Sequence, residues 1–178
     1  ILKTQIPLAN PHSTGPASSR TLSLINRNKE LIRSFFHCHA SSQSDAYEIV
    51  YTSGATAGLK TVADYFPWRR ESVLVYPRQV HTSVLGMREI VLKCGGRFRC
   101  VDDFWVCGEG WEERLRDWQC GEREEAVEGE GRGETIYHLI VVPLECNFTG
   151  DRFDVAPLMN AVRNVNATQD GRCGNRHV

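Results

Sequence analysis

The stretch that most constrains the fold of this chain runs from Tyr47 to Phe66, where an extended pattern gives way to a helical one across a short loop. Residues 47–52 are mostly β-branched or aromatic, which is typical of a strand. Apolar residues then recur at helical spacing, at Leu59, Val62, Ala63 and Phe66. The sequence therefore predicts a strand, a tight connection and a helix with one apolar face.

The connection, Ser53–Thr56, has the composition of an anion-binding loop. Gly54 can adopt backbone angles that are closed to other residues, and the small Ala55 lets the main chain approach a ligand. Thr56 places a hydroxyl beside the first N–H groups of the helix, which lack partners and lie at the positive end of the helix dipole. We expect a phosphate there. The alternative is that Ser53 or Thr56 only caps the helix, and the loop matches neither the Walker pattern nor GxGxxG.

Short apolar runs alternate with helical patterns along the rest of the chain. Strands are predicted over 72–76, 98–101 and 136–144. Between the first two, a helix capped by Thr82 or Ser83 is predicted to run to Gly95–Gly96. This alternation predicts an α/β fold with a mostly parallel sheet and helices on both faces, in which ligands bind at the carboxyl ends of the strands. His81 and Asn147 each follow such a strand, so we expect both at that rim.

The chain is expected to form one partial domain over residues 1–165, followed by a polar tail over 166–178. An irregular, proline-containing arm covers residues 1–20. Residues from about 103 to 134 form an insertion whose end is acidic and rich in glycine. A flexible surface segment is the simpler interpretation of this insertion, and an acidic docking loop is the alternative. Three further helices are predicted, over 21–36, 111–120 and 155–164.

Composition removes several classes of function. A net charge of -1 over 178 residues offers no strong attraction to nucleic acid or to an anionic membrane, so neither is an expected partner, and no apolar run approaches the length of a membrane span. Seven cysteines without a CxxC pair suit a cytoplasmic protein with reduced thiols. His37-Cys38-His39 lacks a second pair of ligands, so no metal site is expected. A start at Ile1 in place of Met suggests a fragment or a processed product.

Five motifs carry a resemblance to a known family. In chain order they are Asn10–Ser13 (NPHS), Thr52–Lys60 (TSGATAGLK), Phe66–Trp68 (FPW), His81–Arg88 (HTSVLGMR) and Asn147–Gly150 (NFTG). Together they resemble the aminoterminal domain of the molybdenum cofactor sulfurase family, a branch of the cysteine-desulfurase, or class V aminotransferase, group of pyridoxal-phosphate enzymes. The resemblance covers residues from about 10 to 157 without the acidic insertion. HTSVLGMR favours the molybdenum branch over other desulfurases or selenocysteine lyases, which are the alternative.

The resemblance implies the large domain of a fold-type I transferase with pyridoxal 5'-phosphate as its cofactor. Ala55 and Thr56 would then hold the cofactor phosphate, as the loop alone already indicates. His81 would stack its imidazole on the pyridine ring, and Asn147 would hydrogen-bond the hydroxyl oxygen of the ring. The substrate side of the cleft would be formed by Asn10, His12 and Ser13.

The same resemblance implies a reaction in which sulfur from L-cysteine passes through an enzyme cysteine to the molybdenum cofactor of molybdenum hydroxylases, with a homodimer left open. The family's cofactor-binding lysine, its aspartate at the pyridine nitrogen and its persulfide cysteine lie beyond the matched region. Lys60 and Lys93 fall on predicted helices, and Cys146 next to a buried strand suits packing better than nucleophilic attack. No catalytic residue is therefore assigned, and the chain alone is expected to be inactive. A truncated, inactive remnant is the competing hypothesis.

Overall fold

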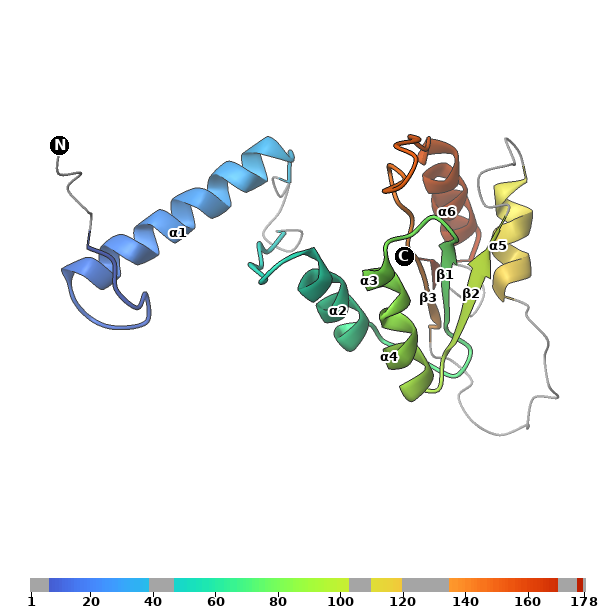
Figure 1. The fold of residues 1–178 in the computed structure, drawn as a ribbon, viewed down its shortest axis with the longest axis horizontal. Coiled ribbons are helices and arrows are strands. Elements are labelled where there is room, and N and C mark those ends of the chain that lie inside the picture. The colour runs from blue at the N-terminus through green and yellow to red at the C-terminus, as the bar shows by residue number, and fades with distance from the viewer. Residues whose placement is uncertain (1–6, 39–46, 103–109, 120–134, 170–175, 178) are drawn as a thin grey trace. The chain divides into compact units, whose positions relative to one another are not determined.

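The computed structural model describes residues 7–38, 47–102, 110–119, 135–169 and 176–177 (Figure 1). The chain divides into two compact units, Ile1–Thr52 and Ser53–Val178. The second contains the sheet and most of the predicted site.

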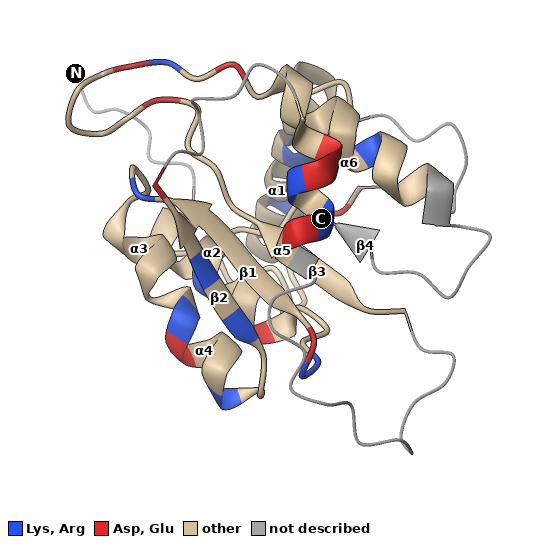
Figure 2. Ribbon diagram, turned by 90° about the vertical axis from the view of Figure 1, so that its right-hand side faces the viewer, with Lys and Arg blue, Asp and Glu red and all other residues tan. Residues whose placement is uncertain are grey.

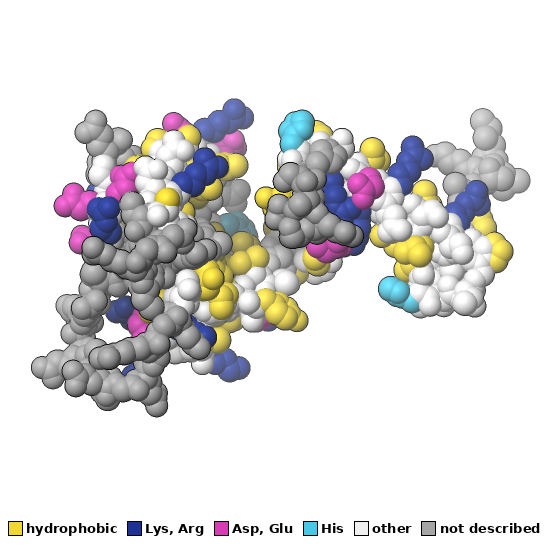
Figure 3. All heavy atoms as spheres, turned by 180° about the vertical axis from the view of Figure 1, so that it is seen from behind, with side chains coloured by type: hydrophobic (Ala, Val, Ile, Leu, Met, Phe, Trp, Pro, Cys, Tyr) yellow, Lys and Arg dark blue, Asp and Glu magenta, His cyan; other side chains and the backbone are white. Residues whose placement is uncertain are grey.

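Among the described residues of the first unit, the main element is helix α1 (Pro16–Phe35). It begins inside the arm that was expected to be irregular up to residue 20. The physical reason is that Pro16 stands in the first turn, where its fixed φ suits a helix and its missing N–H costs nothing. Several large apolar side chains of α1, among them Leu31 and Phe35, remain exposed, and apolar side chains are visible on this unit in Figure 3.

Residues 47–52, predicted as a strand, are irregular and mostly exposed. The segment is instead held to α1 by polar contacts. The Arg33 side chain donates from Nε to the Tyr47 carbonyl at 3.0 Å, and the Glu48 carboxylate pairs with Lys29 and Arg33. A strand is stable only when its backbone groups pair in a ladder, so the β-rich composition of this run was not sufficient and the prediction was wrong.

The second unit contains a four-stranded parallel sheet with the order β2-β1-β3-β4. Its strands are β1 (Val73–Pro77), β2 (Arg97–Val101), β3 (Tyr137–Ile140) and β4 (Arg176–His177). The α/β class and the parallel sheet predicted from the sequence are confirmed. β2 lies at one edge of the sheet and carries basic residues (Figure 2). β4 lies in the segment that was expected to be a polar tail without regular structure. Its two residues form a strand because they pair with β3.

Helices cover both faces of this sheet (Figure 1). One face carries α2 (Ala55–Tyr65), α3 (Thr82–Leu85) and α4 (Met87–Lys93), and the other carries α5 (Trp111–Gln119) and α6 (Ala156–Gln169). The single helix predicted after residue 81 is divided in two at residue 86. The last helix continues to residue 169, five residues beyond its expected end, because one of its inward-facing valines lies in this extension and is buried.

Alternation along β1 explains the two layers of the core. Val73 and Val75 face α5 and α6, whereas Leu74 and Tyr76 face the helices of the opposite side. All five residues of β1 are buried, as expected for a central parallel strand. We call the two sides the α5–α6 face and the α2–α4 face.

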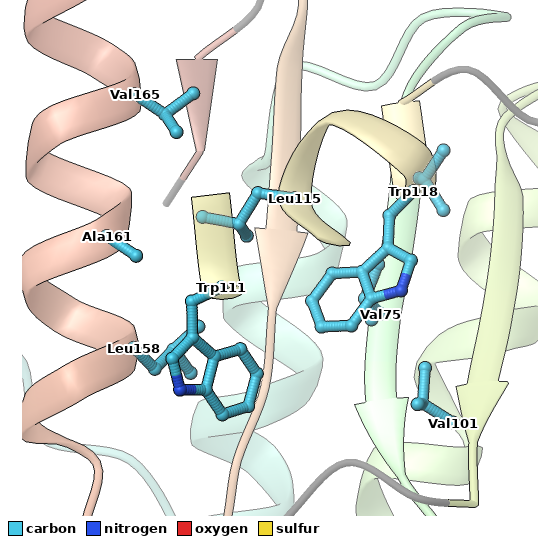
Figure 4. Packing of buried hydrophobic residues seen from close by; sticks show 9 residues of the cluster. Val75, Val101, Trp111, Leu115, Trp118, Leu158, Ala161 and Val165 are labelled. Carbon is cyan, nitrogen blue, oxygen red and sulfur yellow. The ribbon is translucent and has the colours of Figure 1, made fainter. Parts of the chain in front are cut away.

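The α5–α6 face is filled by the residues shown in Figure 4. Trp111, Leu115 and Trp118 recur on one side of α5 and are buried, as the sequence pattern predicts. The two tryptophan rings meet edge to face with centroids 6.3 Å apart. The neighbouring helix on the same face, α6, contributes Leu158, Ala161 and Val165.

The end of α2 is closed by a tryptophan. The indole Nε1 of Trp68 donates to the carbonyl of Ala63 at 2.7 Å in a buried position. This carbonyl belongs to the last turn of α2, where carbonyl groups lack helical partners, so the bond satisfies a group that burial would otherwise destabilise. The ring of Trp68 also contacts that of Phe66, with centroids 4.3 Å apart.

Candidate functional site

A cavity of about 660 Å³ lies on the α2–α4 face, between the start of α2 and the α3–α4 pair. It lies wholly within the second unit. Its lining residues are Thr56, Lys60, His81, Thr82, Ser83, Gly86, Met87, Glu89 and Ile90. Two residues singled out by the sequence, Thr56 and His81, therefore both line this cavity, which we call the α2–α4 groove.

The start of α2 has the properties of an anion site. Gly54 is the N-cap, with φ 156° and ψ 176°, a conformation that side chains rarely adopt. Because a glycine holds this position, no side chain caps the helix, and the alternative in which Ser53 or Thr56 serves as a simple N-cap does not apply. The first turn contains no acidic residue, so its N–H groups present an uncompensated positive end. Ala55 lies here and is exposed.

A chain of hydrogen bonds connects α2 to the loop after β1. The Oγ1 of Thr56 lies 2.7 Å from the Oγ of Ser83, which lies 2.9 Å from the Nδ1 of His81. The same Nδ1 accepts the backbone N–H of Ser83 at 3.2 Å, which makes His81 the N-cap of α3. The expectation that Thr82 or Ser83 caps this helix was wrong, because the imidazole supplies the acceptor instead.

The sequence pattern did not reveal Ser83 as a member of this hydrogen-bonded chain. Its position two residues after His81 is a spacing at which a side-chain acceptor can meet a backbone donor, and that was the available signal. The contact with Thr56 spans 27 positions of the chain and has no local signature. Lys60, also missed as a groove residue, pairs with Asp64 at 2.5 Å one helical turn further along α2.

Asn147 lies on the turn that follows β3 and is exposed. Since β1 and β3 are adjacent and parallel, this turn and the loop of His81 leave the sheet at the same rim. The turn is closed by two backbone bonds, from Cys146 N–H to the Asp151 carbonyl at 2.8 Å and from Gly150 N–H to the Cys146 carbonyl at 2.9 Å. Asn147 is nevertheless absent from the lining of the groove. Its role at the cofactor therefore stays a prediction.

The neighbouring Cys146 is buried. The hydroxyl of Thr149 lowers the pKa of its thiol, the backbone N–H groups of Thr149 and Phe148 add to this, and burial and Asp151 oppose it. These donors stabilise a thiolate. Burial restricts the access of a reacting partner to the sulfur.

Asn10, His12 and Ser13 lie in the first unit, on an exposed turn. The Asn10 side chain accepts the backbone N–H of His12 at 2.9 Å, and the Asn10 carbonyl accepts the N–H of Ser13 at 3.1 Å. This is the local turn that asparagine side chains commonly stabilise. Their proposed place beside a substrate stays a prediction.

Neither a metal site nor a membrane span is found among the residues that the structure describes. No three histidine, cysteine or acidic side chains come together there as metal ligands. The helices described between residues 7 and 169 are all too short or too polar to cross a bilayer.

The chain is similar to curated molybdenum cofactor sulfurases. That of Solanum lycopersicum is 38% identical over 152 residues, which is 82% of this chain and 18% of the relative. That of Arabidopsis thaliana is 34% identical over 155 residues, again 82% of this chain and 18% of the relative. That of Bos taurus is 30% identical over 153 residues, with 83% and 16% covered. The chain thus spans less than a fifth of the length of these relatives.

No protein-family model matches the chain. No solved structure matches it either.

Proposed function

This chain belongs to the molybdenum cofactor sulfurase family and covers less than a fifth of the length of its relatives. We propose that its α2–α4 groove binds pyridoxal 5'-phosphate. The observation that carries the proposal is the connection of Thr56, at the open start of α2, to His81 through the hydroxyl of Ser83. Two loops that are distant in sequence thereby offer an anion site and an aromatic ring to one ligand. The fold then corresponds to part of the large domain of a fold-type I pyridoxal-phosphate enzyme.

The cofactor phosphate fits the start of α2. The N–H groups of Ala55 and Thr56 and the hydroxyl of Thr56 would bind its oxygens, with the helix dipole adding attraction. An added Cβ at Gly54 would meet no atom within 4 Å, so there is open space at this point for a ligand to approach the main chain. The residues present therefore fit a phosphate group.

The ring of the cofactor would be held by the two remaining predicted residues. His81 would cover one face of it with the imidazole, whose position is restrained by its bonds to Ser83. Asn147 would donate from its amide to the hydroxyl oxygen of the ring. When bound, pyridoxal phosphate supplies an electron sink for bond cleavage at an amino acid.

For the whole protein we propose the family's activity, which is removal of sulfur from L-cysteine and its transfer to the molybdenum cofactor of molybdenum hydroxylases. A cytoplasmic location and a homodimer belong to the same proposal. No lysine, aspartate or cysteine of this chain is assigned to the chemical steps. The 178-residue chain by itself should therefore bind the cofactor weakly and release no alanine from cysteine.

The proposal is tested by titrating the chain with pyridoxal phosphate and following the absorbance and fluorescence of the cofactor. Saturable binding is expected, with affinity reduced about tenfold or more in Thr56→Val, because a hydrogen bond to a charged group is lost. His81→Ala should weaken binding as well.

Thr61→Val is the matched control. Thr61 is on the same helix, and its Oγ1 donates to the carbonyl of Ala57 one turn earlier. If Thr56→Val and Thr61→Val bind pyridoxal phosphate with equal affinity, the cofactor phosphate does not bind at the start of α2. Release of alanine from cysteine by this chain would instead contradict its assignment as inactive and show that the chemical groups are present after all.

A further inference from the structure

Ser83 occupies the centre of the hydrogen-bonded chain in the groove. It is partly buried, whereas Thr56 and His81 on either side of it are exposed. Its two polar groups both meet the imidazole Nδ1, the N–H at 3.2 Å and the Oγ at 2.9 Å, while the Oγ also meets the Thr56 hydroxyl at 2.7 Å. The residue thus restrains both neighbours at once.

The direction of these bonds follows from the backbone donor. A backbone N–H can only donate, so the Nδ1 of His81 must accept and carries no proton in this arrangement. The proton of the neutral imidazole is then on Nε2. The hydroxyl of Ser83 can also donate to Nδ1, and the hydroxyl of Thr56 can donate to Ser83.

An anion at the start of α2 would reorganise this chain. A phosphate oxygen accepts the single proton of the Thr56 hydroxyl, so the Thr56 oxygen is left as an acceptor towards Ser83. The Ser83 hydroxyl can then donate its one proton either to the Thr56 oxygen or to the Nδ1 of His81. Occupation of the phosphate site would therefore change the hydrogen bond that His81 receives from Ser83.

We propose that Ser83 is a positioning residue, which fixes His81 in the tautomer with its proton on Nε2 and holds the Thr56 hydroxyl at the start of α2. The inference rests on the proposed function for its ligand, since it concerns the same groove. Its first part concerns the chain without any ligand and stands independently.

The tautomer is measured by NMR of the ring nitrogens in the 178-residue chain labelled with ¹⁵N-histidine, at a pH where the imidazole is neutral. The signals of His81 are assigned from their loss in His81→Gln. The wild type should show mainly the Nε2–H form. Ser83→Ala removes the hydroxyl but keeps the backbone N–H that Nδ1 accepts, so the Nε2–H form should remain the major one. The Nδ1 resonance should nevertheless move towards that of free imidazole, and the minor tautomer should increase roughly three- to tenfold, the change expected when one of two hydrogen bonds to Nδ1 is lost.

Ser83→Thr keeps the hydroxyl and should restore the wild-type signals, whereas a purely structural role for the residue would not follow the hydroxyl in this way. Thr61→Val, on α2 but outside the groove, should leave them unchanged. Identical His81 spectra in wild type and Ser83→Ala would overturn the proposal.

A second measurement separates this inference from the proposed function. Inorganic phosphate is added, and the backbone amide signals of Ala55 and Thr56 are followed together with the ring of His81. We expect both sets to shift in the wild type and the ring response to be lost in Ser83→Ala. Amides that shift while the ring does not respond in the wild type overturn the coupling and leave the anion site intact. If the amides do not respond, the phosphate site fails, while the ligand-free tautomer result still decides the role of Ser83.

Discussion

The two faces of the sheet share the same strands but differ in how completely they are closed. On the α5–α6 face, buried side chains of both helices pack over the valines of β1 and form a continuous apolar cluster (Figure 4). On the α2–α4 face, the helices bury a second apolar cluster, and residues of α2, α3 and α4 also line the groove. The difference indicates that the α5–α6 face mainly stabilises the unit. The α2–α4 face is packed less completely and leaves polar groups exposed at the ends of strands and helices.

The sharpest test of this comparison is a large-to-small change on the closed face. Leu115 is fully buried, so Leu115→Ala should lower the free energy of unfolding by about 2–5 kcal/mol. Leu92 on α4 is half exposed, and Leu92→Ala should cost much less. Urea denaturation followed by tryptophan fluorescence measures both. Equal costs would mean that the closed face has no special share in stability.

A buried hydrogen bond provides the next largest effect, and it lies at the end of α2. Trp68→Phe keeps a ring beside Phe66 but leaves the Ala63 carbonyl without its indole donor. We expect a loss of about 1–3 kcal/mol in the free energy of unfolding. Tyr65→Phe, at a nearby exposed position, is the control and should be close to neutral. A neutral Trp68→Phe would show that water replaces the indole.

A smaller, pH-dependent effect is expected where α5 meets α6. The pKa of Glu112 lies below its usual 4.5 because its own backbone N–H and then the Asn164 amide donate to the carboxylate, against a smaller effect of desolvation. A carboxylate with a lowered folded pKa contributes stability above its unfolded pKa, and this is lost as the pH falls through the folded value. Glu112→Gln should therefore flatten the decline of the melting temperature below pH 4.5. A curve parallel to that of the wild type would show that the contact contributes nothing.

The smallest effect on stability is expected in the groove itself. Thr56 is exposed at the start of α2, and Thr56→Val should change the free energy of unfolding by no more than about 0.5 kcal/mol even though it weakens phosphate binding. Denaturation and phosphate titration on the same sample measure the two quantities. A large loss of stability would instead mean that the bond to Ser83 holds α2 in place.

Much of the secondary structure of the second unit could be predicted from the pattern of apolar residues along the sequence. β1 combines β-branched and aromatic side chains with full burial, and α5 places its two tryptophans and Leu115 on one side. Residues 47–52 show the limit of the same reasoning, because they have a similar composition but no ladder. The candidate site was predictable as far as Thr56 and His81, which follow local rules for helix starts and strand ends. Ser83 was not, since its contact with Thr56 depends on how α2 and α3 approach each other.

The sequence by itself determined the periodicities of this chain, the glycine at the start of α2 and the alternation of strands and helices from β1 to α6, because these depend on neighbours within about a turn of the backbone. Only the tertiary structure decided which extended run would find a strand to pair with and which hydroxyl would lie between Thr56 and His81. Both outcomes depend on contacts between segments tens of residues apart, whose free energy is gained only after the sheet has brought them together.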